Sequence, residues 1–223
     1  MPTTRIVIEK GVSPLVFSEE TTRRIATGWA ALQSRDPRVY NGTLLRTLHA
    51  VSTDTTSVSV APDIGYREVV GLRSYRDFLD WTSAEEQFQV LSAIAFVETT
   101  DGKVLLKDRS TGDWGHSMEL LGGFFTAQDV FGTVEEYIRA RVAAELSLPL
   151  ETVSHVDFMS TCESMFVFKV SLTIPFNDLI QTPMRFSAIP EGYTPSKHQS
   201  FFSIPLHSPS QTVLERFLPA VIG

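Results

Sequence analysis

The chain has 223 residues, of which 43% are apolar and 20% are charged. A chain of this length can bury one sizeable core, or one core with a smaller appended lobe, and we expect no more than two domains. The net charge of -7 repels polyanions, which excludes a nucleic-acid polymer as the main partner but leaves room for a small phosphorylated ligand in a local basic pocket.

The cysteine content and the hydropathy indicate a cellular compartment. Cys162 is the single cysteine, so an internal disulfide is excluded and a reducing environment is favoured. No apolar run approaches the roughly 20 residues that span a bilayer. The first residues, MPTTRIVIEKG, lack the apolar core of a signal peptide. We therefore expect a cytoplasmic protein that does not act at a membrane.

The first third of the chain predicts a small α+β lobe. Residues 5–9 alternate like a short strand, and a helix follows with Ser18 as its N-cap. Three β-leaning runs separated by turn residues then predict a small antiparallel sheet, at residues 41–51, 57–61 and 66–72. A short helix and a polar connector over residues 74–87 give the best candidate boundary. We expect the lobe to cover residues 1–82.

The remainder, residues 83–223, predicts a mixed sheet with helices on its faces, so the fold class is α/β (α+β). Strands at residues 88–99 and 103–109 are expected to form a hairpin, and another strand runs into Gly122 and Gly123. Thr133 and Glu136 form a capping-box pattern for a helix that continues to about residue 148. Two further strands and a final helix are expected at residues 153–160, 165–174 and 208–221.

One stretch resembles the signature of the Nudix superfamily, G-x5-E-x7-R-E-U-x-E-E-x-G-U, where U is a bulky aliphatic residue. MELLGG, from Met118 to Gly123, matches the apolar strand end with two glycines at which that signature usually begins. ARVAAELSL, from Ala140 to Leu148, aligns with the core R-E-U-x-E-E-x-G-U of the signature. Glu145 falls on the second of the paired glutamates. The resemblance implies a Nudix-like α/β/α sandwich that hydrolyses a nucleoside diphosphate linked to another group, with Mg²⁺ or Mn²⁺ as cofactor. The first lobe loosely resembles the N-terminal extension of eukaryotic members that act on nucleotide sugars.

The signature is degenerate in its metal ligands. Ala140, Arg141, Ala144 and Ser147 replace the core arginine, two glutamates and the glycine, and the isolated upstream glutamate has no counterpart. Magnesium prefers hard oxygen ligands, and Glu145 is the one signature glutamate that remains as a metal ligand. Arg141 lies four residues before Glu145, a spacing that predicts an ion pair on the helix. The magnesium-dependent mechanism of the family is therefore not expected to operate unchanged.

Three interpretations of this stretch are left open. In the first, acids from elsewhere rebuild the metal site; the candidates are Glu119, Asp129, Glu135, Glu136 and Glu163. In the second, cations replace the metal, and Arg141 holds a phosphate or carboxylate directly. In the third, Arg141 and Glu145 form an ordinary surface pair on a disused scaffold.

The leading hypothesis is that the protein binds, and if catalytic hydrolyses, a nucleoside diphosphate derivative or a related organic diphosphate. The candidate catalytic residues are Glu145, Glu119 and His116, the last because a histidine can act as a general base without a metal. The candidate ligand-binding residues are Gly122, Gly123, Arg139, Arg141, Phe124 and Trp114. The five histidines show no zinc-ligand spacing, and Cys162 is expected to be structural.

Two alternatives come from other functional classes. The loss of metal ligands, together with Phe124, Phe125 and Trp114 near the site, is also typical of a metal-free enzyme that isomerises or cyclises an apolar small molecule. A non-catalytic ligand-binding or interaction module is the third possibility. Phe201 and Phe202 are expected to belong to a strand in the core.

Overall fold

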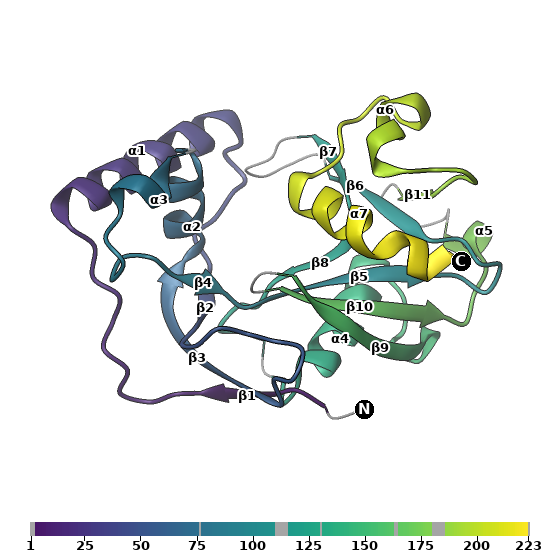
Figure 1. Cartoon of the computed structure of the whole chain (residues 1–223), viewed down its shortest axis with the longest axis horizontal. Helices are drawn as coiled ribbons and strands as arrows, with labels where there is room; N and C mark the ends of the chain where they lie inside the picture. The colour runs from purple at the N-terminus through teal and green to yellow at the C-terminus, as the bar shows by residue number, and fades with distance from the viewer. Residues whose placement is uncertain are drawn as a thin grey trace.

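A computed structural model describes residues 3–75, 77–109, 116–129, 131–162, 165–179 and 186–222. Trp114 and Glu163, both named as site candidates from the sequence, lie outside these ranges. Within them, no helix combines the length and apolar character needed to cross a membrane. The arrangement is mixed α and β, as the sequence predicted (Figure 1).

The first lobe contains a four-stranded sheet with three helices. Its strand order is β1-β3-β2-β4, and β1 pairs with β3 in parallel while the other pairs are antiparallel. The strands are β1 (Arg5–Ile8), β2 (Thr43–Thr47), β3 (Ser57–Gly65) and β4 (Gln89–Val90). The helices are α1 (Glu19–Arg35), α2 (Tyr66–Arg73) and α3 (Phe78–Trp81), which gather at one end of the lobe (Figure 1).

Helix α1 begins as predicted, because the Ser18 side chain accepts a hydrogen bond from the Thr21 backbone. The strand expected at residues 66–72 is wrong, since this segment forms α2. Its first turn is closed by the Glu68 carboxylate, which accepts the Gly65 N–H at 2.7 Å. Helix α2 then packs so closely on α1 that a Cβ on Gly28 would lie 2.7 Å from the Gly71 carbonyl oxygen. Capping and close helix packing override the β preference of the two valines in YREVVGL.

The second part of the chain is built on a mixed sheet with the order β8-β5-β10-β9. The central pair, β5 and β10, is parallel, and both outer pairs are antiparallel. The strands are β5 (Ser92–Glu98), β8 (Leu121–Phe124), β9 (Val153–Cys162) and β10 (Met165–Leu172). Helix α4 (Val134–Glu145) covers one face and α7 (Ser208–Ile222) the other (Figure 1). Two apolar clusters, one including Ile138 and the other Val213, fill these layers. The expected α/β/α sandwich is confirmed.

A third sheet, of order β11-β6-β7, changes two of the predicted connections. It contains β6 (Leu105–Arg109), β7 (Ser117–Glu119) and β11 (Phe186–Ala188). The predicted hairpin of β5 and β6 is wrong as a continuous pair, because the two strands separate after a single bridge and join different sheets. The predicted strand into the double glycine is also divided. It breaks at Leu120, whose N–H donates to the Ser210 hydroxyl at 3.1 Å.

The remaining described elements are short. They are α5 (Phe176–Leu179), α6 (His198–Phe201) and the 3₁₀ turns η1 (Leu150–Thr152) and η2 (Pro195–Lys197). The expectation of a strand at Phe201 and Phe202 is wrong. The segment forms the turn of α6 instead, closed by a hydrogen bond from the Phe202 N–H to the His198 carbonyl at 2.9 Å, and Phe201 is 40% exposed.

Backbone hydrogen bonds join the first lobe to the rest of the chain. The Thr4 N–H donates to the Glu135 carboxylate, and the Val134 N–H donates back to the Thr4 carbonyl at 3.0 Å. A second set of bonds runs from Leu45 to Phe125 and from Phe125 to Leu91. The lobes are therefore in contact along an extended seam. The division of the chain near residue 82 stays a prediction.

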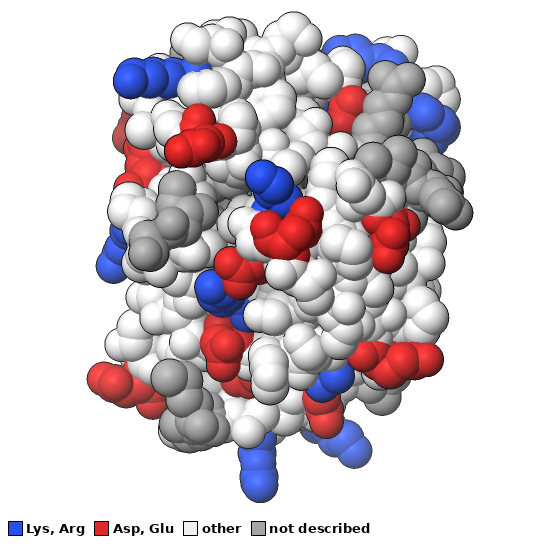
Figure 2. All heavy atoms as spheres, turned by 90° about the vertical axis from the view of Figure 1, so that its right-hand side faces the viewer, with Lys and Arg blue, Asp and Glu red and all other residues white. Residues whose placement is uncertain are grey.

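Charged side chains of both signs are intermixed on the face of the molecule drawn in Figure 2. One pair of this kind links Lys169 on β10 to Glu98 on β5 at 3.0 Å. Such partly exposed pairs contribute little to stability, about 1 kcal/mol or less. Another group of charged side chains lines a cleft of the molecule.

Candidate functional site

A cleft of about 1180 Å³ lies between the first lobe and the second part of the chain. Its lining includes residues of α2, α3 and β4 from the first lobe and residues of β5, β6, β7, β8, α4 and α7 from the second part. The polar lining residues of the second part include Lys107, Asp108, Arg109, His116, Glu119, Arg141, His207 and Ser210. A cleft whose apolar lining carries a few convergent polar groups is the expected form of a small-molecule site.

The double glycine forms part of the cleft wall. Gly122 and Gly123 have φ angles of +127° and +149°, which residues with a side chain rarely adopt. A Cβ on Gly122 would lie 2.2 Å from the carbonyl oxygen of Ala93, so the strand could not pack against β5. At Gly123 the nearest atom to such a Cβ would be Nη2 of Arg141, at 3.7 Å. Gly122 therefore allows β8 to pack against β5, whereas Gly123 leaves the Arg141 guanidinium accessible.

Arg141 is held by the carboxylate that the sequence predicted as its partner. Its Nε donates to Glu145 Oε1 at 2.7 Å. Burial opposes the charge of Arg141, but Glu145 raises the pKa of the guanidinium above its usual value, so the group stays charged. The carboxylate of Glu145 is only 6% exposed and also contacts Lys107 Nζ at 3.2 Å. The interpretation as an ordinary surface pair does not describe this geometry, because Glu145 is buried and has two cations.

Glu119 forms a second cluster that shares the same lysine. Its carboxylate lies 3.4 Å from Lys107 Nζ, 3.1 Å from Arg109 Nη1 and 3.9 Å from His207 Nδ1. Glu119 and Glu145, both buried, are therefore bridged by one ammonium group. We call Lys107, Arg109, Glu119, Arg141 and Glu145 the bridged cluster. It contains three fixed positive charges and two carboxylates.

The described residues do not fit a magnesium or manganese ion of the kind that the signature implies. The Lys107 ammonium contacts both carboxylates, Glu119 at 3.4 Å and Glu145 at 3.2 Å, and a cation fixed there repels a divalent metal ion. Among the described residues no group of three or more histidine, cysteine or acidic side chains is arranged to hold a metal.

The other acids considered for the metal have structural partners. Asp129 accepts the N–H and the hydroxyl of Thr126, and Glu135 accepts the Thr4 N–H. Glu136 closes the predicted capping box of α4 with Thr133. These three carboxylates stabilise the loop before α4 and the start of the helix, whereas Glu119 alone of the described candidates lines the cleft with Arg141.

His116 faces the cleft with a carboxylate beside it. Its Nε2 lies 2.7 Å from Asp108 Oδ1, and the histidine side chain is 56% exposed. A proton on Nε2 directed at the carboxylate leaves Nδ1 as the basic nitrogen. This arrangement can orient an imidazole as a general base, which is the role that the sequence suggested for His116.

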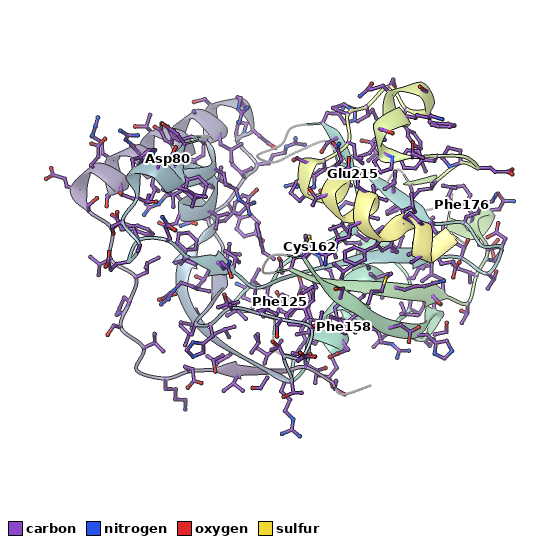
Figure 3. The ribbon with its side chains drawn as sticks, in the orientation of Figure 1. Asp80, Phe125, Phe158, Cys162, Phe176 and Glu215 are labelled. Carbon is purple, nitrogen blue, oxygen red and sulfur yellow. The ribbon has the colours of Figure 1, made fainter. Side chains whose placement is uncertain are left out.

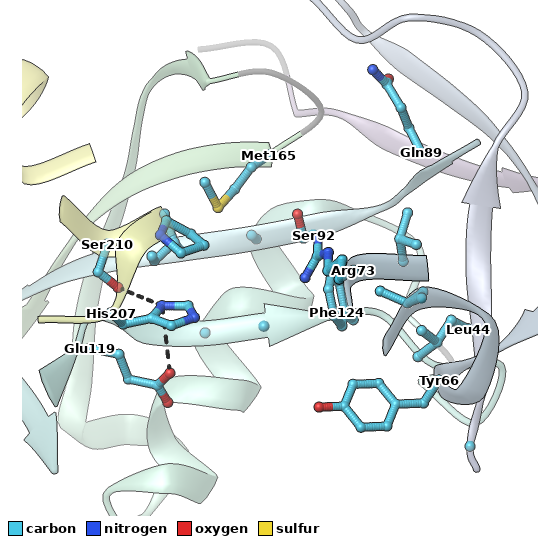
Figure 4. Close-up of a pocket in the computed structure, with 18 of the residues that line it drawn as sticks. Leu44, Tyr66, Arg73, Gln89, Ser92, Glu119, Phe124, Met165, His207 and Ser210 are labelled. Carbon is cyan, nitrogen blue, oxygen red and sulfur yellow. Dashed lines mark hydrogen bonds and ion pairs between the residues drawn. The ribbon is translucent and has the colours of Figure 1, made fainter. Parts of the chain in front are cut away.

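His207, Ser210 and Glu119 meet at the same wall, as Figure 4 shows. His207 Nδ1 lies 3.2 Å from the Ser210 hydroxyl and 3.9 Å from Glu119. A serine triad uses both imidazole nitrogens, one for the serine and one for the acid. Here one nitrogen faces both groups, and the fully buried Ser210 accepts the Leu120 N–H. The group is therefore a structural junction and not a nucleophilic triad.

The two phenylalanines after the double glycine point to different places. Phe124 lines the cleft between Tyr66 and Arg73 of the first lobe (Figure 4). Its ring centroid lies 6.5 Å from that of Tyr66 and 5.2 Å from the guanidinium carbon of Arg73. Phe125, labelled in Figure 3, is fully buried. It stacks on Tyr137 with a centroid distance of 3.5 Å. The expectation that Phe125 lies near the site is wrong, because the strand directs it into the core.

The candidates from the sequence are only partly brought together. Gly122, Gly123, Phe124, Arg141, Glu119 and His116 line the cleft, and Glu145 anchors Arg141 from beneath. Arg139 does not line the cleft, because its guanidinium donates to the Val153 carbonyl. The cleft residues that the sequence analysis missed include four basic side chains: Lys107, Arg109, Arg73 and His207. Alternate positions on a strand place Lys107 and Arg109 on one face, which is the one signal that could have indicated them.

Comparison with known proteins gives likenesses in structure only. No family model and no curated protein sequence matches the chain. Its structure is similar to a Nudix hydrolase from M. smegmatis, RenU, with 17% identity and a TM-score of 0.38 over 60% of this chain and 87% of that chain. It is also similar to a MutT/nudix family protein from Enterococcus faecalis, with 15% identity and a TM-score of 0.33 over 65% of this chain and 68% of that chain.

Proposed function

We propose that the cleft binds a nucleoside diphosphate derivative or a related organic diphosphate, and that fixed cations take the role of a metal ion. The observation that carries this proposal is the position of Arg141. Its guanidinium is anchored by a buried carboxylate and lies against the backbone of Gly123, where no side chain separates it from the cleft. A guanidinium binds phosphate oxygens with two parallel hydrogen bonds.

The geometry of Arg141 within the bridged cluster supports an anionic ligand. Its side chain is 42% exposed, although its partner Glu145 is only 6% exposed. The Nε of Arg141 is used for Glu145, while Nη2 is the atom nearest to Gly123. The anchoring fixes the guanidinium before any ligand binds, which reduces the entropy lost on binding.

Hydrolysis by this protein would depend on groups other than a metal. His116 is the candidate base, since Asp108 orients its ring at the edge of the cleft. The water oxygen would attack a phosphorus atom, His116 would take the water proton, and the bridging P–O bond would break with its electron pair on the departing phosphate. This step uses no oxidant or reductant.

A second candidate function is a metal-free isomerase or cyclase for an apolar small molecule. The observation that favours it is Phe124, which presents an aromatic ring to the cleft beside Arg73. Conversion of an organic phosphate without release of inorganic phosphate or diphosphate would support this candidate. Release of phosphate would support hydrolysis.

The binding proposal is tested by thermal unfolding and calorimetry without metal. In buffer with EDTA, inorganic pyrophosphate and ADP-ribose at about 100 times Kd should stabilise the protein by about 2.7 kcal/mol, which raises Tm by about 5–10 °C. Arg141→Gln should weaken binding by about 10- to 100-fold, because a hydrogen bond to a charged group is lost.

The matched control is Arg23→Gln, which removes an exposed arginine from α1, outside the cleft. It should leave binding unchanged. Binding that requires Mg²⁺ or Mn²⁺ would contradict the substitution of cations for metal. The absence of any Tm shift with every phosphate tested would contradict the proposed function itself.

A further inference from the structure

The wall that the first lobe contributes to the cleft carries exposed apolar side chains. Tyr40 is 75% exposed and Leu79 is 59% exposed, and both line the cleft. Phe78 and Phe88, each half-buried, lie on the same wall. Large apolar side chains that are exposed together at a cavity mark a surface that an apolar group can cover.

Three polar side chains of that wall, Glu86, Gln87 and Thr82, already make hydrogen bonds within the protein. Glu86 accepts the backbone N–H groups of Ser18 and Ser83 at 2.6 Å and 3.0 Å. Gln87 donates to two backbone carbonyls, and the Thr82 hydroxyl donates to a third at 2.7 Å. These three side chains therefore offer few hydrogen bonds to the hydroxyl groups of a sugar, and a site built for hydroxyls would need such groups.

A cation lies where this wall meets the glycine strand. Arg73 ends α2, is exposed, and lies over the ring of Phe124. Arg141 approaches the preceding residue, Gly123, from the other part of the chain. Figure 4 shows Arg73 and Phe124 together beside the strand, with Leu44 and Tyr66 to their right and below them. An anion at the glycine strand thus has an arginine from each part of the chain, and the aromatic rings of Phe124 and Tyr66, 6.5 Å apart, lie beside it on the same cleft lining.

We infer that the first lobe recognises the organic part of the ligand, and that this part is an alkyl or aromatic group and not a sugar. The ligand is then an organic phosphate or diphosphate with an apolar body, whose charged end lies between Arg73 and Arg141. This inference rests on the proposed function, because it assigns the chemistry of the second half of the same ligand.

The test is a series of n-alkyl diphosphates from methyl to octyl, measured by calorimetry beside inorganic pyrophosphate and uridine diphosphate glucose. Each methylene that becomes buried should increase the affinity by about fourfold. Leu79→Ser and Tyr40→Ser should lower the affinity for octyl diphosphate by about tenfold and leave that for methyl diphosphate unchanged. Leu150→Ser, at a leucine that is 50% exposed outside the cleft, is the matched control and should change neither.

Arg73→Gln separates the charged end of the ligand from its apolar body. It should weaken methyl and octyl diphosphate by the same factor, about tenfold, because each loses the same charged contact. Arg23→Gln on α1 is again the control.

The outcomes separate this inference from the proposed function. An affinity that rises with chain length and falls in the Leu79 and Tyr40 variants supports the inference. An affinity that is constant along the series, or tighter binding of uridine diphosphate glucose than of octyl diphosphate, would overturn the inference while leaving the proposed function intact. If neither pyrophosphate nor any organic diphosphate binds, the proposed function is overturned and the inference with it.

Discussion

Replacement of Lys107 by methionine tests whether one ammonium group holds the site together. Lys107 Nζ contacts Glu145 at 3.2 Å and Glu119 at 3.4 Å, and all three side chains are between 6% and 13% exposed. Methionine keeps the length and apolar stem of the side chain but removes the charge. Two buried carboxylates then face each other without the cation that separates them.

The expected loss is about 3 kcal/mol. Removal of one partner from a buried ion pair costs about 3–5 kcal/mol. The lower end applies here, because Glu145 keeps Arg141 and Glu119 keeps Arg109. For a chain of this length the loss corresponds to a decrease in Tm of about 6–12 °C. Urea denaturation at pH 7, with the free energy of unfolding extrapolated to water, measures the change.

The control is Lys169→Met, which breaks a pair of similar length, 3.0 Å to Glu98, whose side chains are 31% and 26% exposed. It should cost less than about 1 kcal/mol. The double variant Lys107→Met, Glu145→Gln should lose at least about 1 kcal/mol less than the sum of the single variants, because their charges interact. Equal losses in the Lys107 and Lys169 variants, or strict additivity with Glu145→Gln, would refute the bridging role.

Three further predictions concern stability. Burial raises the pKa of Glu86, but backbone hydrogen bonds from Ser18 and Ser83 outweigh this effect and lower the pKa from 4.5 to about 2. Glu86→Gln should therefore lower the free energy of unfolding by about 2 kcal/mol at pH 7. When this free energy is measured as a function of pH, the difference between wild type and variant should disappear between pH 4.5 and 2. Gly122→Ala should cost at least about 3 kcal/mol and lower Tm by several degrees, because the Cβ would meet the Ala93 carbonyl at a φ of +127°; an unchanged Tm would contradict the packing argument. Burial raises the pKa of Tyr137 above its unfolded value of 10.0, so the neutral phenol favours folding below pH 10 and this contribution is lost above pH 10. The Tm of the wild type should therefore fall more steeply above pH 10 than the Tm of Tyr137→Phe.

The elements that could be predicted from the sequence were those with local signals. The caps at Ser18 and Thr133 and the central strand β10 were correct, because a cap is specified within four residues and a buried strand by its own apolar run. Helix α2 was missed because its stability comes from close packing on α1, between glycines that lie far apart in the sequence. Helix propensity is a property of single residues and therefore does not predict such a contact.

The candidate site divides in the same way. Arg141 and Glu145 were predicted as a pair because they lie one helical turn apart. Lys107 could not be assigned to them, since it comes from a strand that leaves the main sheet after a single bridge and joins another. Arg73 was missed for a related reason: it belongs to a helix of the first lobe, and its place over Phe124 depends on how the two parts of the chain meet.

The hydrogen bonds of Thr4 bear on the order in which the chain can fold. The Thr4 N–H and the Glu135 carboxylate are 131 positions apart in the sequence. During synthesis from the N-terminus, β1 cannot complete these bonds until the start of α4 has left the ribosome. Contacts between residues so far apart in the sequence cost chain entropy when they close, which slows folding. Strand β1 can pair with β3 earlier, but its hydrogen bonds to the helix that carries Arg141 form only after that helix has been made.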